Sequence, residues 1–344
     1  MCRSWLALAA SALLAACGGG HVERDAGPAS DAASPTPDLD ASVSRDGATE
    51  DAEAPLLAIP PPGEPMPEEL STLGVAVTDE EESHPAIVEY EPSPALWTNG
   101  SEKRRLLYLP PDTQIVGQTV FQFPIGTTFF KELSYGGVRV ETRVMRLLEE
   151  GWEYNVYLWE GEETRLLDAS VPVEVEVETE EGTLVHVVPS RRDCRTCHES
   201  NADTEVIGFD ALRLGEQLDA LTERGVFAAR PVDAPPIVGR TSLETQVMAY
   251  VYGNCVHCHN GERGPSRAFD MRPAVFVEHV VDIETTGSGA PRGLRVASGD
   301  PDASVLYVAL SRQTPFTMPP LGVQRTNDTV LGLVHDWISS LPSL

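Results

Sequence analysis

Two C-x-x-C-H motifs constrain this 344-residue chain more than any other feature, because they take four of its six cysteines. They read Cys194-Arg195-Thr196-Cys197-His198 and Cys255-Val256-His257-Cys258-His259. A haem attached by two thioethers needs cysteines three positions apart and a histidine next in line to ligate the iron. The sequence therefore predicts two c-type haems. Cys194, Cys197, Cys255 and Cys258 would bind them covalently, with His198 and His259 as iron ligands.

A zinc site and a thioredoxin-like redox pair are the other uses of such cysteines. Zinc could bind two C-x-x-C pairs, but the histidine that follows each pair would then be a coincidence. A thioredoxin-like pair belongs in a βαβ context, and the sequence pattern predicts none here. Haem attachment is the interpretation that uses both cysteines and the histidine of each motif.

The first 16 residues are typical of an export signal. Arg3 gives a positive start, and an apolar run extends from Trp5 to Ala16. The tetrapeptide that ends at Cys17 resembles a bacterial lipobox, which implies lipidation of Cys17 in the mature protein. Gly18 after it implies the outer membrane. We therefore expect an exported protein, anchored by its lipid in the bacterial cell envelope, on the periplasmic face or the surface of the outer membrane.

Charge and hydropathy each exclude one class of protein. The chain has 25 Lys and Arg against 53 Asp and Glu, a net charge of -28, whereas nucleic-acid binding needs a basic face. The sequence has no run of about 18 apolar residues, which excludes a multi-span membrane protein.

Residues 17–95 are rich in Pro, Ala, Ser and acids, a composition that predicts a disordered tether.

Residues 96–190 have the period of two that is typical of strands. Val171, Val173, Val175 and Val177 alternate with Glu174, Glu176 and Glu178. Similar short runs, among them Thr119–Phe123, are separated by glycine-containing turns at 135–137, 149–151 and 180–182. This pattern predicts an antiparallel β sandwich or barrel.

After Ser190 the apolar period approaches that of helices. Helices are predicted after the caps Asp210, Asp300 and Asn327, and another from Leu243 to Val251 runs into Cys255. We assign residues 191–240 to a first haem-binding segment and 241–344 to a second haem domain. The fold class expected is α+β multidomain, a β domain followed by an all-α haem region.

Met318 lies in the loop Thr317-Met318-Pro319-Pro320, 59 positions after His259. A helix, C-x-x-C-H, a helix, an M-P-P loop and a final helix together resemble a class I cytochrome c domain over Thr241 to Leu341. The resemblance implies Met318 as the distal iron ligand of the second haem, which suits electron transfer.

The chain from Leu96 onward also resembles a family of bacterial di-haem c-type cytochrome lipoproteins with a β domain before the haems. The matching segments are LWTNGSEKRRLLYLPP, FPIGTTFFKELSY, VPSRRDCRTCH, YVYGNCVHCHN, SGDPDASVLYVAL and TMPPLG. This family implies electron transfer. It implies no particular substrate.

The distal ligand of the first haem stays open, because the first motif has no M-P-P loop of its own. Met248 could point from its helix toward a neighbouring haem, and a packing role is the alternative. Met145, His186 and His257 are further candidates. A strand histidine such as His186 is more typically a structural one, and we expect His257 to be solvated.

Arginines crowd the first motif. Arg191, Arg192 and Arg195 could balance the haem propionates or only solvate a loop.

These features predict a membrane-anchored di-haem cytochrome that transfers single electrons between a redox donor and a redox acceptor, and that is an electron carrier more than an enzyme. One alternative is a di-haem peroxidase-like enzyme with an open first haem. Another is a binding module in the β domain with the haems as a relay, for which Trp97, Trp152 and Trp159 are the only support.

Overall fold

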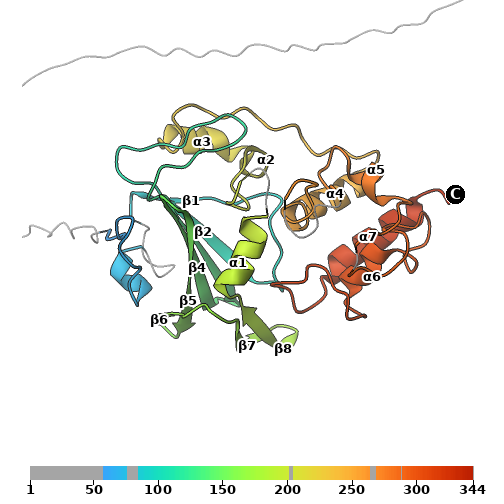
Figure 1. Cartoon of the computed structure of the whole chain (residues 1–344), viewed down its shortest axis with the longest axis horizontal. Coiled ribbons are helices and arrows are strands. Elements are labelled where there is room, and N and C mark those ends of the chain that lie inside the picture. Colours follow the sequence, from blue (N-terminus) through green and yellow to red (C-terminus); the bar gives the residue numbers. More distant parts are fainter. Residues whose placement is uncertain (1–56, 76–83, 201–203, 264–268, 288, 344) are drawn as a thin grey trace, which may run out of the picture. The chain divides into compact units, whose positions relative to one another are not determined.

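The computed structural model describes residues 57–75, 84–200, 204–263, 269–287 and 289–343. Within them an antiparallel sheet region is followed by helices, so the predicted α+β class is confirmed (Figure 1). The export signal of residues 1–16, the lipidation site Cys17 and the tether up to residue 56 lie outside this range. No helix in the described part is long and apolar enough to cross a membrane.

Six strands form one antiparallel meander in which each strand pairs with the next. They are β1 (Ile87–Glu89), β2 (Glu102–Tyr108), β3 (Thr128–Tyr135), β4 (Val138–Leu148), β5 (Gly151–Glu160) and β6 (Glu163–Leu166). The β3–β4 turn holds Gly136 and Gly137 at positive φ, as a tight hairpin requires. A separate hairpin joins β7 (Val173–Thr179) to β8 (Gly182–Val188).

The strands described here form an open sheet and a hairpin, whereas we expected a sandwich or barrel. Other segments of the chain cover both faces of the sheet, so apolar surface is buried without closure or a second large sheet. The strand predicted at Thr119–Phe123 is wrong. That segment makes only an isolated bridge between Val116 and Gln122.

One face of the sheet is covered by residues that we had placed in the tether. The short 3-10 helix η1 (Leu70–Leu73) brings Leu70 and Leu73 against Phe130 and Tyr157 of the sheet. Strand β1 also falls within the predicted tether. The few apolar residues of the predicted tether show no periodicity in so Pro-rich a segment. Those described here become ordered because the sheet offers a complementary apolar face.

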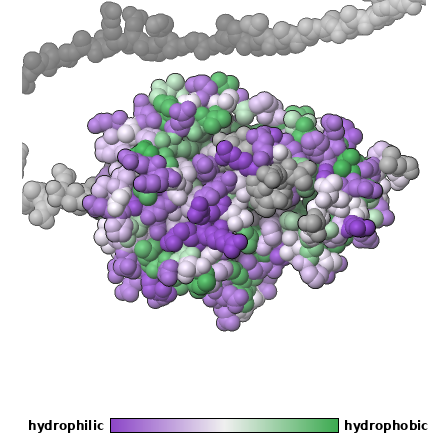
Figure 2. Space-filling model, in the orientation of Figure 1, coloured by the Kyte–Doolittle hydropathy of each residue, from purple (hydrophilic) through white to green (hydrophobic). Residues whose placement is uncertain are grey.

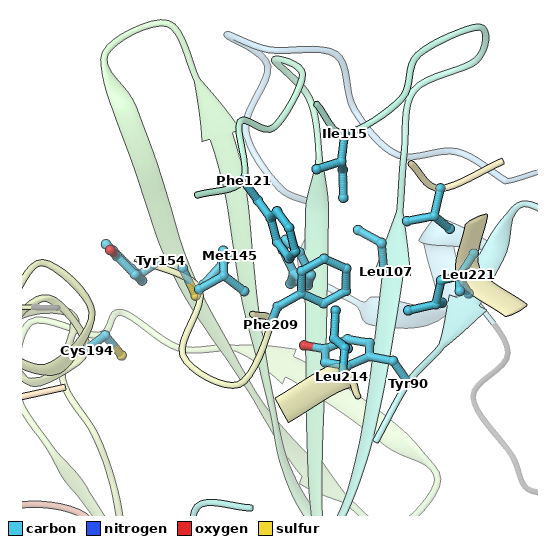
Figure 3. Close-up of a cluster of buried hydrophobic side chains, with 14 of the residues drawn as sticks. Tyr90, Leu107, Ile115, Phe121, Met145, Tyr154, Cys194, Phe209, Leu214 and Leu221 are labelled. Carbon is cyan, nitrogen blue, oxygen red and sulfur yellow. The ribbon is translucent and has the colours of Figure 1, made fainter. Parts of the chain in front are cut away.

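The opposite face carries the helices that follow the sheet. They are α1 (Arg191–His198), α2 (Ala211–Leu214) and α3 (Gln217–Glu223). Phe209 lies at the centre of this core, with ring centroids 4.9 Å from Tyr90 and 5.2 Å from Phe129 (Figure 3). Most of the surface shown in Figure 2 is hydrophilic, in keeping with apolar side chains gathered in internal clusters.

The C-terminal helices form a second core. They are α4 (Ser242–Asn254), α5 (Phe276–Val280), α6 (Val305–Ser311) and α7 (Asp328–Ser340). Trp337 of α7 stacks on Phe276 at 5.5 Å and donates a hydrogen bond to Glu244 of α4. The predicted cap Asn327 is confirmed, but the helix expected after Asp300 begins at Val305 with Ser304 as its cap.

A buried polar network sits on the helix-bearing face of the sheet. The carboxylate of Glu141 accepts two hydrogen bonds from Arg143, at 2.5 and 3.0 Å, and lies 2.8 Å from Nε2 of His186. The Tyr135 hydroxyl lies 3.1 Å from Nδ1 of the same imidazole. Burial alone would raise the pKa of Glu141, but Arg143 and His186 outweigh it and lower this pKa to about 2.

We expect Glu141→Gln to lower the free energy of unfolding by about 3 kcal/mol, because it leaves the Arg143 charge without its buried partner. The pKa of Glu141 is lower in the folded than in the unfolded chain. The contribution of ionised Glu141 to the free energy of unfolding is therefore complete above about pH 4.5 and is lost as the pH falls toward 2.

Urea unfolding of both proteins across this pH range measures the effect. Glu162→Gln is the matched control, since Glu162 pairs with Arg139 but is 81% exposed and should contribute less than about 1 kcal/mol. Equal losses in the two variants would contradict the role of the network.

Candidate cofactor-binding site

The first C-x-x-C-H motif lies within helix α1. Ser190 caps this helix: its hydroxyl accepts from the backbone N–H of Asp193, and its own N–H donates to the Asp193 carboxylate. Positions three and four apart share one side of a helix, so Cys194, Cys197 and His198 lie together. Cys194 is buried against the sheet, in the same cluster as Met145 and Tyr154 (Figure 3).

His198 is held as an iron-ligating histidine needs to be held. Its Nδ1 lies 2.6 Å from the backbone carbonyl of Glu205, so a proton on Nδ1 donates there and leaves Nε2 free. Burial lowers the pKa of His198 to about 4, which keeps the ring neutral at pH 7, the form that binds metals. The Tyr154 ring lies 5.5 Å away.

The second motif follows the last turn of α4. That turn is tied to the segment before β2, because the side-chain carbonyl of Asn254 accepts from the backbone N–H of Trp97 at 2.8 Å. The N–H of His259 donates to the carbonyl of Cys255 at 2.9 Å, and the imidazole of His259 lies 4.6 Å from the Phe269 ring. Burial lowers the pKa of His259 to about 4.

The two motifs meet at their second cysteines. The sulfur atoms of Cys197 and Cys258 and a ring nitrogen of His257 lie within 4.8 Å of one another. The nearby Cys258 thiol and the His257 ring lower the pKa of Cys197, whereas the nearby Cys197 and burial raise the pKa of Cys258. His257 is only 6% exposed, so our expectation of a solvated His257 was wrong.

A single cavity of about 590 Å³ is lined by both motifs. It is within the size range of sites for small molecules and cofactors. Met318 lines the same cavity from the loop after α6, where its N–H donates to the carbonyl of Ala309 at 3.1 Å. The structure thus brings together the four motif cysteines, His198, His259 and Met318.

The four candidates for the first distal ligand fall into two groups. Met145 and His257 line the cavity. Met248 lies in the buried cluster of the C-terminal helices and is not among the lining residues described. His186 is fully buried with both ring nitrogens engaged by Tyr135 and Glu141, which confirms its structural role.

The arginines next to the first motif do not line the cavity. Arg191, Arg192 and Arg195 are exposed, and Arg195 pairs with Glu199 at 2.7 Å, four residues along the same helix. Arg192 and Arg195 solvate the surface of α1, whereas Arg191 donates a hydrogen bond to the Tyr154 carbonyl.

Three cations that the sequence analysis missed line the cavity from the sheet: Arg105, Lys131 and Arg143. Each lies on a different strand, β2, β3 or β4. In a strand, a charged residue normally indicates the face that is exposed to solvent. Only the cross-strand register, which was not predicted, shows that the three lie opposite one another.

No protein-family model, curated protein or solved structure matches this chain. What can be said of its function therefore rests on the motifs and on the geometry around them.

Proposed function

We propose that this protein is a lipid-anchored di-haem c-type cytochrome that passes single electrons between redox partners in the bacterial cell envelope. One observation carries the proposal. Both C-x-x-C-H motifs, 61 positions apart in the chain, line one cavity together with Met318.

The residues around the cavity suit haem binding. The described cysteines are all free thiols, as thioether formation requires. His198 presents a neutral ring with its Nδ1 engaged, so that Nε2 is the atom that would ligate iron. A bound haem iron supplies reversible one-electron chemistry.

Apolar side chains close off much of the same cavity. Phe129, Met145 and Val206 line it near the first motif, and Phe269 and Leu306 line it near the second. Such a wall excludes water and lowers the local dielectric, which tunes the reduction potential of a bound haem.

Residues 241–344 are proposed to be a class I cytochrome c-like domain. The order of α4, second motif, α6, Met318 loop and α7 supports this, as does the packing of α4 against α7 through Glu244 and Trp337. A Met thioether at Met318 would close the second site to exogenous ligands and favour electron transfer.

The proposed partners are a protein electron donor and a protein electron acceptor. The chain carries a net charge of -28, so a docking partner should present a basic or apolar face. We further propose that a lipid on Cys17 keeps the protein at the membrane.

Pyridine haemochrome analysis of the protein, expressed with a cytochrome c maturation system, should give two c-type haems per chain. Replacing Cys194 and Cys197 together by Ala should leave one haem, and so should replacing Cys255 and Cys258. Fewer than two haems in the wild-type chain would refute the proposed function.

Met145 is our candidate for the sixth ligand of the first haem, because it lines the cavity and shares a cluster with Cys194. Met145→Ala and Met248→Ala remove similarly buried side chains, 7% and 5% exposed, and each should cost about 2–5 kcal/mol of stability. Met145→Ala should alter the spectrum and potential of the first haem, whereas Met248→Ala should alter neither.

Met318→Ala should alter the second haem alone, in the same potentiometric and spectroscopic titrations. An effect of Met248→Ala as large as that of Met145→Ala would show that packing, and not ligation, causes the change.

The cluster of Cys197, His257 and Cys258 favours a second candidate function, a transition-metal site. Two thiolates and an imidazole are a donor set that suits zinc. Only this triad, however, would then have a purpose, and Cys194, Cys255, His198 and His259 would have none.

His257→Ala separates the two functions. A zinc site would lose a ligand, so metal analysis of the purified variant should show less bound zinc than the wild type. A di-haem cytochrome should keep two haems per chain, because His257 is neither one of the two thioether cysteines nor the iron-ligating histidine of its motif. We expect the second result.

A further inference from the structure

A row of three cations crosses the sheet face that bears the cavity. Arg105 of β2 is the register partner of Lys131 of β3, and Lys131 is the register partner of Arg143 of β4. Adjacent strands are about 4.8 Å apart, so the row spans about 10 Å. All three residues line the cavity.

Within the described protein, only the Arg143 end of this row has a direct ion pair. Arg143 donates to the Glu141 carboxylate through Nε at 3.0 Å and Nη2 at 2.5 Å. Among the described residues the side chains of Arg105 and Lys131 make no hydrogen bond or ion pair. Glu91 attracts Arg105 and Glu141 attracts Lys131 only through longer-range electrostatics. Both are substantially buried, and the resulting desolvation, with the neighbouring cations, lowers the pKa of Lys131 well below its ordinary value.

Such a row is unfavourable unless an anion occupies the cavity. Like charges directly opposite each other on neighbouring strands destabilise a sheet, and a buried charge without a partner costs several kcal/mol. Yet the cavity wall includes five cationic side chains, Arg105, Lys131, Arg143, Arg213 and Arg295, and a single acidic one, Asp193. Arg143 and Arg213 are paired with Glu141 and Asp210, which do not line the cavity. Arg105, Lys131 and Arg295 remain as lining cations without an ion pair among the described residues, in a chain of net charge -28.

The row also has a direction. Its Arg143 end is close enough to Cys194 and Cys197 to interact with them electrostatically, and Arg105 lies two strands away from Arg143 at the other end. A haem attached to Cys194 and Cys197 would turn its vinyl edge toward them and its propionate edge away. The distance across two strand spacings is comparable to the width of a porphyrin.

We propose that Arg105 and Lys131 bind the propionates of the first haem, so that the β sheet serves as the anion-binding wall of the haem site. The inference rests on the proposed function and assigns a role to the β domain. Two cations that have no direct ion pair with a described residue would face the two carboxylates of one haem. Arg143 stays paired with Glu141 and does not bind a propionate. Arg105 and Lys131 are positioning residues that also raise the potential of the haem, because a positive charge favours the reduced iron.

Lys131→Met and Arg105→Met should each keep two haems per chain and lower the potential of the first haem. The expected change is roughly a tenfold fall in the ratio of reduced to oxidised haem at a fixed potential, or about 59 mV for a one-electron couple. This is the effect of one charge about 10 Å away in a partly buried site. Potentiometric titration of the holoprotein measures it, and Met318→Ala identifies which of the two potentials belongs to the second haem.

Arg104→Met is the matched control, because Arg104 is the next residue on β2, points to the other face of the sheet and pairs with Glu89. It should leave both potentials unchanged. Lys131→Arg keeps the charge and should keep the potential, but it should shift the propionate bending band in resonance Raman spectra. That band is a second readout, and it remains available if a Met variant does not mature.

Each outcome decides between distinct claims. A wild-type chain with fewer than two haems refutes the proposed function itself. Two haems with potentials in Lys131→Met and Arg105→Met equal to those of Arg104→Met, or a propionate band unmoved in Lys131→Arg, overturn only the inference. A structure of the loaded protein in which Arg105 and Lys131 both bind another anion would do the same.

Discussion

The packing of helix α1 on the six-stranded sheet is the interaction on which the rest of the site depends. Cys194 is buried in the same cluster as Met145 of β4 and Tyr154 of β5, and Arg191 donates a hydrogen bond to the Tyr154 carbonyl. This contact fixes the first C-x-x-C-H motif against one face of the sheet. The second motif then meets the first at Cys197 and Cys258, so one cavity serves both.

The same sheet face offers two kinds of surface side by side. Leu107, Phe129, Met145 and Tyr154 form an apolar row across four strands, and Arg105, Lys131 and Arg143 form a cationic row two residues further along. Side chains two apart on a strand share a face, and all of these residues except Leu107 line the cavity. An amphipathic, anionic cofactor such as haem needs both: an apolar wall for the macrocycle and a positive edge for its carboxylates.

Local patterns made much of the molecule predictable. The alternation of Val and Glu located the hairpin β7–β8, and the caps Asp210 and Asn327 marked the starts of α2 and α7. The boundary of the tether was not predictable in the same way. Leu70 and Leu73 carry no periodic signal among prolines, and they become part of the fold only because the sheet presents an apolar face to them.

The sequence by itself determined which residues we propose to attach and ligate haem, because thioether and iron bonding require cysteine and histidine at a fixed local spacing. Only the tertiary structure decided which residues surround them. It engaged both nitrogens of His186 between the β7–β8 hairpin and the six-stranded sheet, placed Met248 in a helical core, and brought Arg105, Lys131 and Met145 to the cavity wall. The physical reason is that strand register and helix packing join residues far apart in the chain, and no local pattern records which of them will meet.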